Sequence, residues 1–67
     1  MTKQRRTELS SLEGRQVSLA LVDGSRIDDC QLVSAPRGHV DRVWVCVGGQ
    51  DLFFAAEDIA DAWPARP

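Results

Sequence analysis

A chain of 67 residues has room for one hydrophobic core, because a domain of this size buries only about 60% of the surface that its unfolded form exposes. Its formal net charge of −2 is divided unevenly: residues 1–15 carry more basic than acidic groups, and residues 23–63 carry the reverse. An acidic body repels phosphate backbones, which disfavours nucleic-acid binding except through the basic segment or a local arginine cluster. The longest apolar runs, at residues 17–22 and 43–47, are far shorter than the roughly 20 residues that span a bilayer.

The two cysteines indicate the cellular compartment. Cys30 and Cys46 are the only ones, and no apolar run of the kind found in a secretory signal follows the basic residues near the start of the chain. A secreted scaffold held by disulfides is therefore disfavoured. We expect a cytoplasmic protein with reduced thiols and no contact with a membrane.

The first predicted element is a short helix over about residues 8–13. Thr7 is a plausible N-cap, and Gly14 follows where a left-handed C-cap belongs. Leu9 and Leu12 lie three residues apart on one helical face. A stripe of two leucines is too narrow for a helix that folds alone, so we expect this helix to lie across the open end of a sheet.

A hairpin is predicted next. Apolar side chains alternate with polar or small ones over residues 15–22, which is typical of a strand. Asp23 and Gly24 then form the dipeptide most typical of a two-residue type I′ turn, which needs positive φ at both central positions. The second strand must therefore return antiparallel to the first.

This second strand, over residues 25–34, does not alternate cleanly. Ile27 and Cys30 are three residues apart, so both face inward only if one residue is inserted between them. A β-bulge at Asp28 or Asp29 meets that requirement and bends the strand sharply. Strong bends of this kind let a short sheet close on itself.

The remaining elements complete a small all-antiparallel fold. They are a loop at 35–42, a third strand at 43–47, a turn at 48–51, a fourth strand at 52–56, a corner at Glu57 and Asp58, and a fifth strand at 59–63 that ends at Pro64. The third strand is apolar on both faces, which predicts a central position. We expect a mainly β fold, a small five-stranded antiparallel barrel with a short N-terminal helix. This single domain covers residues 7–64, between a disordered basic tail at 1–6 and a C-terminal tail at 65–67.

The order of helix, glycine, strand, Asp-Gly turn and bent strand resembles the first motif of the Sm-like family. The residues that carry this resemblance are Leu12, Gly14, Val17, Leu19, Leu21, Asp23, Gly24, Ile27, Leu32 and Val33. Residues 49–63 are similar to the second motif, with Gly49 and Asp51 before an apolar strand and Ile59 in the closing one. The resemblance covers about residues 8–63 and implies a small barrel that forms rings or dimers.

The residues of the Sm-like RNA pocket are not matched. That pocket takes an Asp and an Asn from the loop after the second strand and an Arg-Gly pair from the second motif. Here the loop at 34–42 has no Asn, and residues 47–49 read Val-Gly-Gly. The Lys-His pair of the bacterial RNA-chaperone branch is also absent. The resemblance therefore implies the fold and self-association more than RNA binding.

One local basic cluster lies outside the N-terminal segment, on the predicted loop before the third strand. Its members are Arg37, His39 and Arg42. Arginine offers a bidentate fork to phosphate or carboxylate, and histidine adds a donor. Together with Arg5 and Arg6 of the tail, these residues are the candidate anion or nucleic-acid contacts. The alternative is a solvated hairpin tip and a tail that only aids solubility.

No metal or catalytic site is predicted. Cys30, Cys46 and His39 supply at most three ligands without a Cys-x-x-Cys element, so we expect both cysteines to be small residues of the core or the layer around it. The acidic residues that form either a carboxylate patch or a solvated face are Asp28, Asp29, Glu57, Asp58 and Asp61. No nucleophile, base and oxyanion set can be assembled, so we expect no cofactor and no enzymatic activity.

The aromatic residues are the candidate interface. Successive strand residues face opposite sides, so Trp44 opposes its valine neighbours and Phe53 opposes Phe54, and one of each pair must leave the barrel interior. An aromatic side chain outside so small a barrel is either covered by the helix or part of an interface. We expect Trp44, Phe53 and Trp63 to form an interface.

These observations predict an interaction module without enzymatic activity. We expect a homo-oligomer that binds a protein or peptide partner, with addition of a strand at a sheet edge as the mode of binding. The alternative is an Sm-like protein that binds nucleic acid, RNA in particular, through the basic tail together with Arg37 and Arg42.

Overall fold

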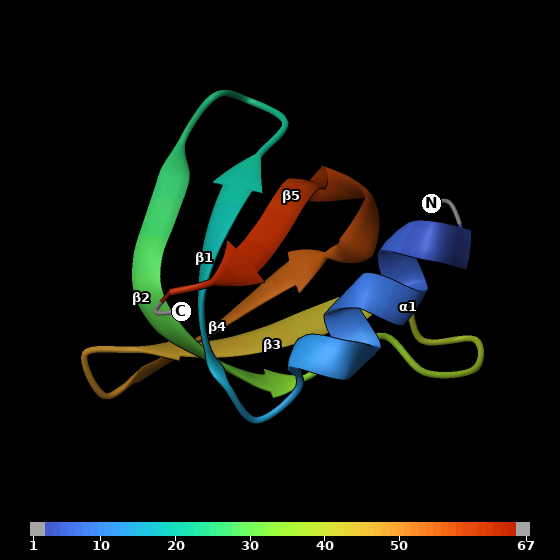
Figure 1. Cartoon of the computed structure of the whole chain (residues 1–67), viewed down its shortest axis with the longest axis horizontal. Helices are drawn as coiled ribbons and strands as arrows, with labels where there is room; N and C mark the ends of the chain where they lie inside the picture. Colours follow the sequence, from blue (N-terminus) through green and yellow to red (C-terminus); the bar gives the residue numbers. More distant parts are fainter. Residues whose placement is uncertain (1–2, 66–67) are drawn as a thin grey trace.

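A computed structural model describes residues 3–65, with side chains from Arg6 onward. One helix, α1 (Lys3–Leu12), precedes five strands and a single-turn 3₁₀ helix, η1 (Ala56–Asp58), as Figure 1 shows. The strands are β1 (Gln16–Leu21), β2 (Arg26–Ser34), β3 (Arg42–Val47), β4 (Gln50–Ala55) and β5 (Ile59–Pro64). All five form one antiparallel sheet, as the sequence predicts.

The sheet is open. Its strand order is β4-β3-β2-β1-β5, so within residues 3–65 β4 and β5 are edge strands that do not pair with each other. Closure into a five-stranded barrel is therefore not confirmed. The middle strand is β2, and β3, predicted to be central, lies between β2 and β4. Val43 and Val45 of β3 are buried on the inner face, whereas Trp44 and Cys46 are only half-buried on the outer face.

Helix α1 begins earlier than the sequence predicts. It starts at Lys3, so the expected N-cap, Thr7, lies inside the helix. Residues 3–6 of the predicted disordered tail are helical because Lys, Gln and Arg all favour helix, and Met1 and Thr2 lie outside the described residues. Gly14 has the predicted left-handed conformation, with a φ of 85°, but its N–H donates to the Leu32 carbonyl oxygen of β2 and not to a carbonyl of the helix.

The predicted bulge in β2 is present. Val17 pairs with Cys30 and Leu19 pairs with Ile27, so two residues of β2 lie opposite one residue of β1. The second of them, Asp29, has a φ of 56°, which is a left-handed conformation. The inserted residue returns Cys30 to the inner face, where its side chain is buried.

The turn between β1 and β2 is not the predicted two-residue type I′ turn. The Gly24 N–H donates to the Leu21 carbonyl oxygen over 3.0 Å, and Leu21 N–H donates to the Ser25 carbonyl oxygen over 2.8 Å. This pattern closes a three-residue loop in which only Gly24 has positive φ. The Asp23 carboxylate instead accepts hydrogen bonds from the Ser25 N–H and Oγ, at 2.8 and 2.6 Å.

The two-residue type I′ geometry occurs between β3 and β4. Gly48 and Gly49 are the only residues of this loop, and their φ values are 57° and 83°. The predicted turn at 48–51 is therefore confirmed at its first two residues, and β4 begins at Gln50, two residues earlier than predicted.

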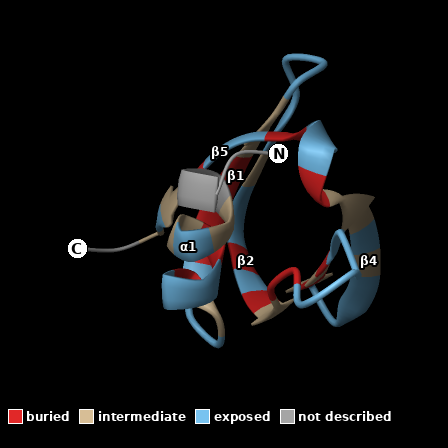
Figure 2. Cartoon of the chain, turned by 90° about the vertical axis from the view of Figure 1, so that its right-hand side faces the viewer, coloured by how far each residue is buried: buried red, intermediate tan, exposed pale blue. Residues whose placement is uncertain are grey.

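The core lies between the inner face of the bent sheet and α1 (Figure 2). Its fully buried side chains are Leu9, Val17, Leu19, Cys30, Leu32, Val43 and Val45. Leu9 and Leu12 are the residues that α1 contributes, as predicted from their spacing. Over residues 3–65, no helix combines the length and the apolar character needed to cross a membrane.

Candidate interaction surface

Edge strand β4 has unpaired backbone groups along one side. The two-residue turn makes Val47 and Gln50 a hydrogen-bonded pair, and alternate residues of an antiparallel ladder face the neighbouring strand. The Ala56 N–H, which donates to the Asp41 carbonyl oxygen over 2.8 Å, continues this alternation. The residues in between direct their N–H and C=O groups away from β3: Asp51, Phe53 and Ala55. The Ala55 carbonyl oxygen, as the N-cap of η1, also accepts the first hydrogen bond of that helix.

The outer face beside this edge carries a stacked aromatic pair. Trp44 and Phe53 are direct cross-strand partners, and their ring centroids lie 5.7 Å apart. The indole Nε1–H of Trp44 donates to Asp51 Oδ1 over 3.1 Å, so its polar end is satisfied. Phe53 remains 56% exposed, which makes it one of three large apolar side chains exposed among the described residues. An oriented aromatic ring is thus open to solvent beside a free strand edge.

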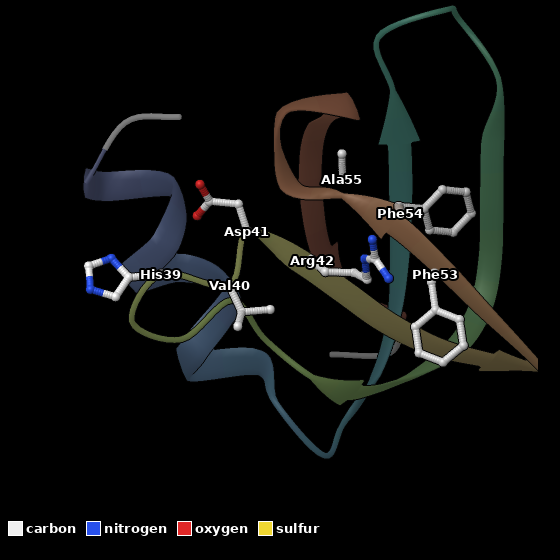
Figure 3. A pocket seen from close by; sticks show the side chains of 7 residues that line it. All are labelled: His39, Val40, Asp41, Arg42, Phe53, Phe54 and Ala55. Atoms are coloured by element: carbon white, nitrogen blue, oxygen red, sulfur yellow. The ribbon is translucent and has the colours of Figure 1, made fainter.

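A hollow of about 600 Å³ adjoins the end of β4 (Figure 3). Its lining residues are His39, Val40, Asp41, Arg42, Phe53, Phe54 and Ala55. In Figure 3 the Arg42 guanidinium extends towards the phenyl rings of Phe53 and Phe54, whereas His39 points away at the far end of the loop. The hollow therefore combines the Arg42 cation with aromatic surface, and the Asp41 carboxylate that also lines it is already paired with Arg6.

Trp63 belongs to a different surface. It lies in β5, at the opposite end of the strand order from β4. The guanidinium carbon of Arg26 lies 5.3 Å from its ring centroid, a cation–π arrangement that covers part of the half-buried indole. Arg26 Nη2 also contacts Asp28 Oδ1 at 2.9 Å. The structure thus brings Trp44 and Phe53 together and separates them from Trp63 in the sheet.

The predicted basic cluster does not converge. Arg37 forms an ion pair with Glu13 at the end of α1, and Arg6 of α1 forms one with Asp41. Arg6 Nη2 also donates to the Gly38 carbonyl oxygen over 3.0 Å. These contacts hold the loop at 35–41 against α1. Arg42 and the exposed His39 both line the hollow, but His39 points away from Arg42 (Figure 3). The side chain of Arg5 lies outside the described residues.

The two cysteines lie on opposite faces of the sheet. Cys30 is fully buried in the core, with its Sγ 3.5 Å from the Val17 carbonyl oxygen, and Cys46 is half-buried on the outer face. Burial, with a smaller contribution from nearby carboxylates, raises the pKa of the Cys30 thiol, which disfavours it as a nucleophile. Nowhere in residues 3–65 do three or more His, Cys, Asp or Glu side chains gather in a way that suits a metal ion.

The acidic residues are spread over three elements. Asp28 and Asp29 form the β2 bulge, Asp61 lies in β5, and Glu57 and Asp58 lie in η1. Strand β1 separates β2 from β5 in the sheet. The arrangement fits a solvated face better than a single carboxylate patch.

Sequence reasoning found the two stacked aromatics but missed what surrounds them. The hydrogen bond from Trp44 to Asp51, and the hollow that holds Arg42 with Phe53, depend on the register of β3 against β4. The two-residue spacing of Gly48 and Gly49 is the signal that fixes this register.

No family model matches the chain, and neither does any curated protein or solved structure.

Proposed function

We propose that the chain is a non-enzymatic interaction module that self-associates and binds a protein or peptide partner through its sheet edges and outer-face aromatics. The observation that carries this proposal is the stacked pair of Trp44 and Phe53, which leaves a ring 56% exposed beside the free edge of β4. Exposed aromatic surface next to an unpaired strand suits contacts made by strand addition. A domain of 67 residues also gains stability from a bound subunit.

The bent sheet supports the further proposal of a small Sm-like barrel. α1, Gly14, β1, the Asp-Gly turn and the bulged β2 follow one another in the order on which that resemblance rests. In this proposal, a neighbouring subunit covers a sheet edge that is free in the single chain, and the module works in the cytoplasm with its thiols reduced.

Binding of nucleic acid is the second candidate function. Arg42 favours it, because a guanidinium beside Phe53 suits a phosphate next to a stacked base. Against it stand the ion pairs that engage Arg6 and Arg37, and a net charge of −2 that repels phosphate backbones. A protein partner is therefore the better supported of the two.

Light scattering over a dilution series, at low and high salt, tests the proposal. We expect an assembly larger than the monomer at both salt concentrations, because backbone pairing and aromatic contacts are not screened by ions. A monomer at every concentration contradicts self-association. RNA binding that weakens steeply with salt, and that is lost in Arg42→Ala but kept in the control Arg15→Ala, favours the second candidate instead.

A further inference from the structure

Only one of the two edge strands offers an uninterrupted ladder of backbone groups. Next to β5, the Ala65 N–H donates to the Gln16 carbonyl oxygen over 3.0 Å. Because alternate residues of an antiparallel ladder bond to the neighbouring strand, the backbone groups of Pro64 face away from β1. Proline has no N–H, so the free side of β5 lacks a donor at this position. The register of β5 also shifts between Ala20 and Leu21 of its neighbour. Strand β4 contains neither a proline nor a register shift.

We infer that β4 pairs antiparallel with the β4 strand of a second copy of the chain, about a two-fold axis at Phe53. This inference rests on the proposed self-association and specifies its geometry. Phe53 lies opposite Phe53 of the second copy, and Asp51 lies opposite Ala55 of the second copy. All three residues whose backbone groups face away from β3 are thereby paired, and the Ala55 carbonyl oxygen, which already caps η1, accepts a second hydrogen bond. If the two-fold axis lay at Leu52 or Phe54 instead, only two of these three residues would pair with each other across the interface.

The side chains on both faces of β4 suit this register. On the outer face, the exposed Phe53 meets its symmetry mate, and Trp44 flanks the pair on each side. Four aromatic rings then lie in a row across four adjacent strands, which is a favourable cross-strand arrangement. On the inner face, the half-buried Leu52 meets Phe54 of the second copy, so the two cores become continuous.

The charges beside the aromatic row are complementary. Within one chain, Arg42 lies opposite Ala55 and Asp51 lies opposite Cys46, so the two charged residues are at opposite ends of the β3–β4 pair. In the inferred dimer, Arg42 of the second copy lies two strands away from Asp51, about 10 Å between Cα atoms. An extended arginine side chain spans most of that distance. The hollow that holds Arg42 thus receives the Asp51 carboxylate of the second copy, once at each end of the interface.

A charge exchange tests this geometry. We expect Arg42→Asp and Asp51→Arg each to weaken dimerisation by about tenfold, because each places like charges together. The double variant restores opposite charges, and we expect its dissociation constant to return to within a few-fold of the unchanged protein. Arg15→Asp is the matched control, because Arg15 lies between α1 and β1, and we expect it to leave dimerisation unchanged.

A mixed disulfide tests the register independently. In a Cys46→Ser background, Asp51→Cys and Ala55→Cys chains are mixed and oxidised. Their Cα atoms lie about 5.5 Å apart across the inferred pair, which suits a disulfide. We expect a cross-linked dimer in the mixture and not in either variant alone. Either this result or rescue by the charge exchange supports the inference. A dimer that shows neither overturns the inference and leaves the proposed function standing, whereas a strict monomer overturns both.

Discussion

The indole of Trp44 and the phenyl ring of Phe53 form a stacked cross-strand pair, with ring centroids 5.7 Å apart and planes inclined by 28°. The two partners differ in their surroundings. Trp44 is half-buried and donates its Nε1–H to Asp51, whereas Phe53 is exposed beside the free edge of β4. The pair therefore holds an apolar ring in a fixed orientation without covering it, and this combination underlies the proposed interface.

The exposure of Phe53 predicts a small cost of removing it from the monomer. We expect Phe53→Ala to lower the free energy of unfolding by about 1 kcal/mol, because the lost interaction is mainly the stack on Trp44. Phe54→Ala is the matched control: its ring packs against the core from the opposite face of β4, and we expect a loss of about 2 kcal/mol or more. Urea denaturation at a dilution where the chain is monomeric measures both. Equal losses would show that Phe53 is also packed internally.

The bulge in β2 predicts opposite effects of two adjacent substitutions. Asp29 has a φ of 56°, so Asp29→Gly removes the side chain that disfavours this conformation, and we expect a gain of about 0.5–1 kcal/mol. Asp28, its neighbour, has no positive φ, and we expect Asp28→Gly to cost about 1 kcal/mol. Urea denaturation of the two variants measures this difference, and we expect the higher midpoint for Asp29→Gly. The reverse order would place the left-handed residue elsewhere.

The packing of α1 predicts a large effect of a single leucine. Leu9 is fully buried, so we expect Leu9→Ala to cost about 2–5 kcal/mol, which is comparable to the whole stability of a domain of this size. Ser10→Ala changes an exposed residue of the same helix, and we expect it to leave stability nearly unchanged. Circular dichroism during thermal unfolding compares the two. If Leu9→Ala unfolds at the temperature of the unchanged protein, α1 does not cover the core.

The turn between β1 and β2 predicts an acid-sensitive carboxylate. Hydrogen bonds from the Ser25 hydroxyl and N–H lower the pKa of Asp23 below its ordinary value of 3.8. A group with a lowered pKa stabilises the folded state above its unfolded pKa, and this contribution is lost as the pH falls through the folded pKa. We expect Ser25→Ala to move the pKa of Asp23 back towards 3.8, and the distant Ser11→Ala to leave it unchanged. An NMR titration of the Asp23 carboxyl carbon follows both, and a pKa that does not respond to Ser25→Ala would contradict the turn.

Local rules predicted the strands and the bulge. Apolar runs bounded by turn residues placed all five strands, and the three-residue spacing of Ile27 and Cys30 required the inserted residue that the structure contains. The start of α1 was missed because Thr7 has the residue type of an N-cap. No glycine or proline precedes Thr7, so the helix extends back to Lys3. The turn at Gly24 was missed because the Asp23 carboxylate bonds to Ser25, a preference that competes with the type I′ geometry.

The features that sequence reasoning did not reach depend on contacts between distant residues. The predicted basic contacts do not converge, because Arg37 of the loop and Arg6 of α1 pair with acidic residues 24 and 35 positions away in the chain. Closure of the sheet depends on whether β4 and β5 meet, which no local pattern specifies. The difference between β4 and β5 as edge strands depends on which backbone groups face outward, and this follows from the register of each strand against its neighbour.

The solution mass of two matched variants tests the proposed interface most directly. Phe53 and Val22 are similarly exposed apolar residues, at 56% and 63%, but only Phe53 lies on β4. We predict that Phe53→Ser is monomeric in light scattering at concentrations where the unchanged protein and Val22→Ser are both dimeric. If Phe53→Ser keeps the mass of the unchanged protein across the dilution series, the β4 edge and its aromatic pair are not the interface.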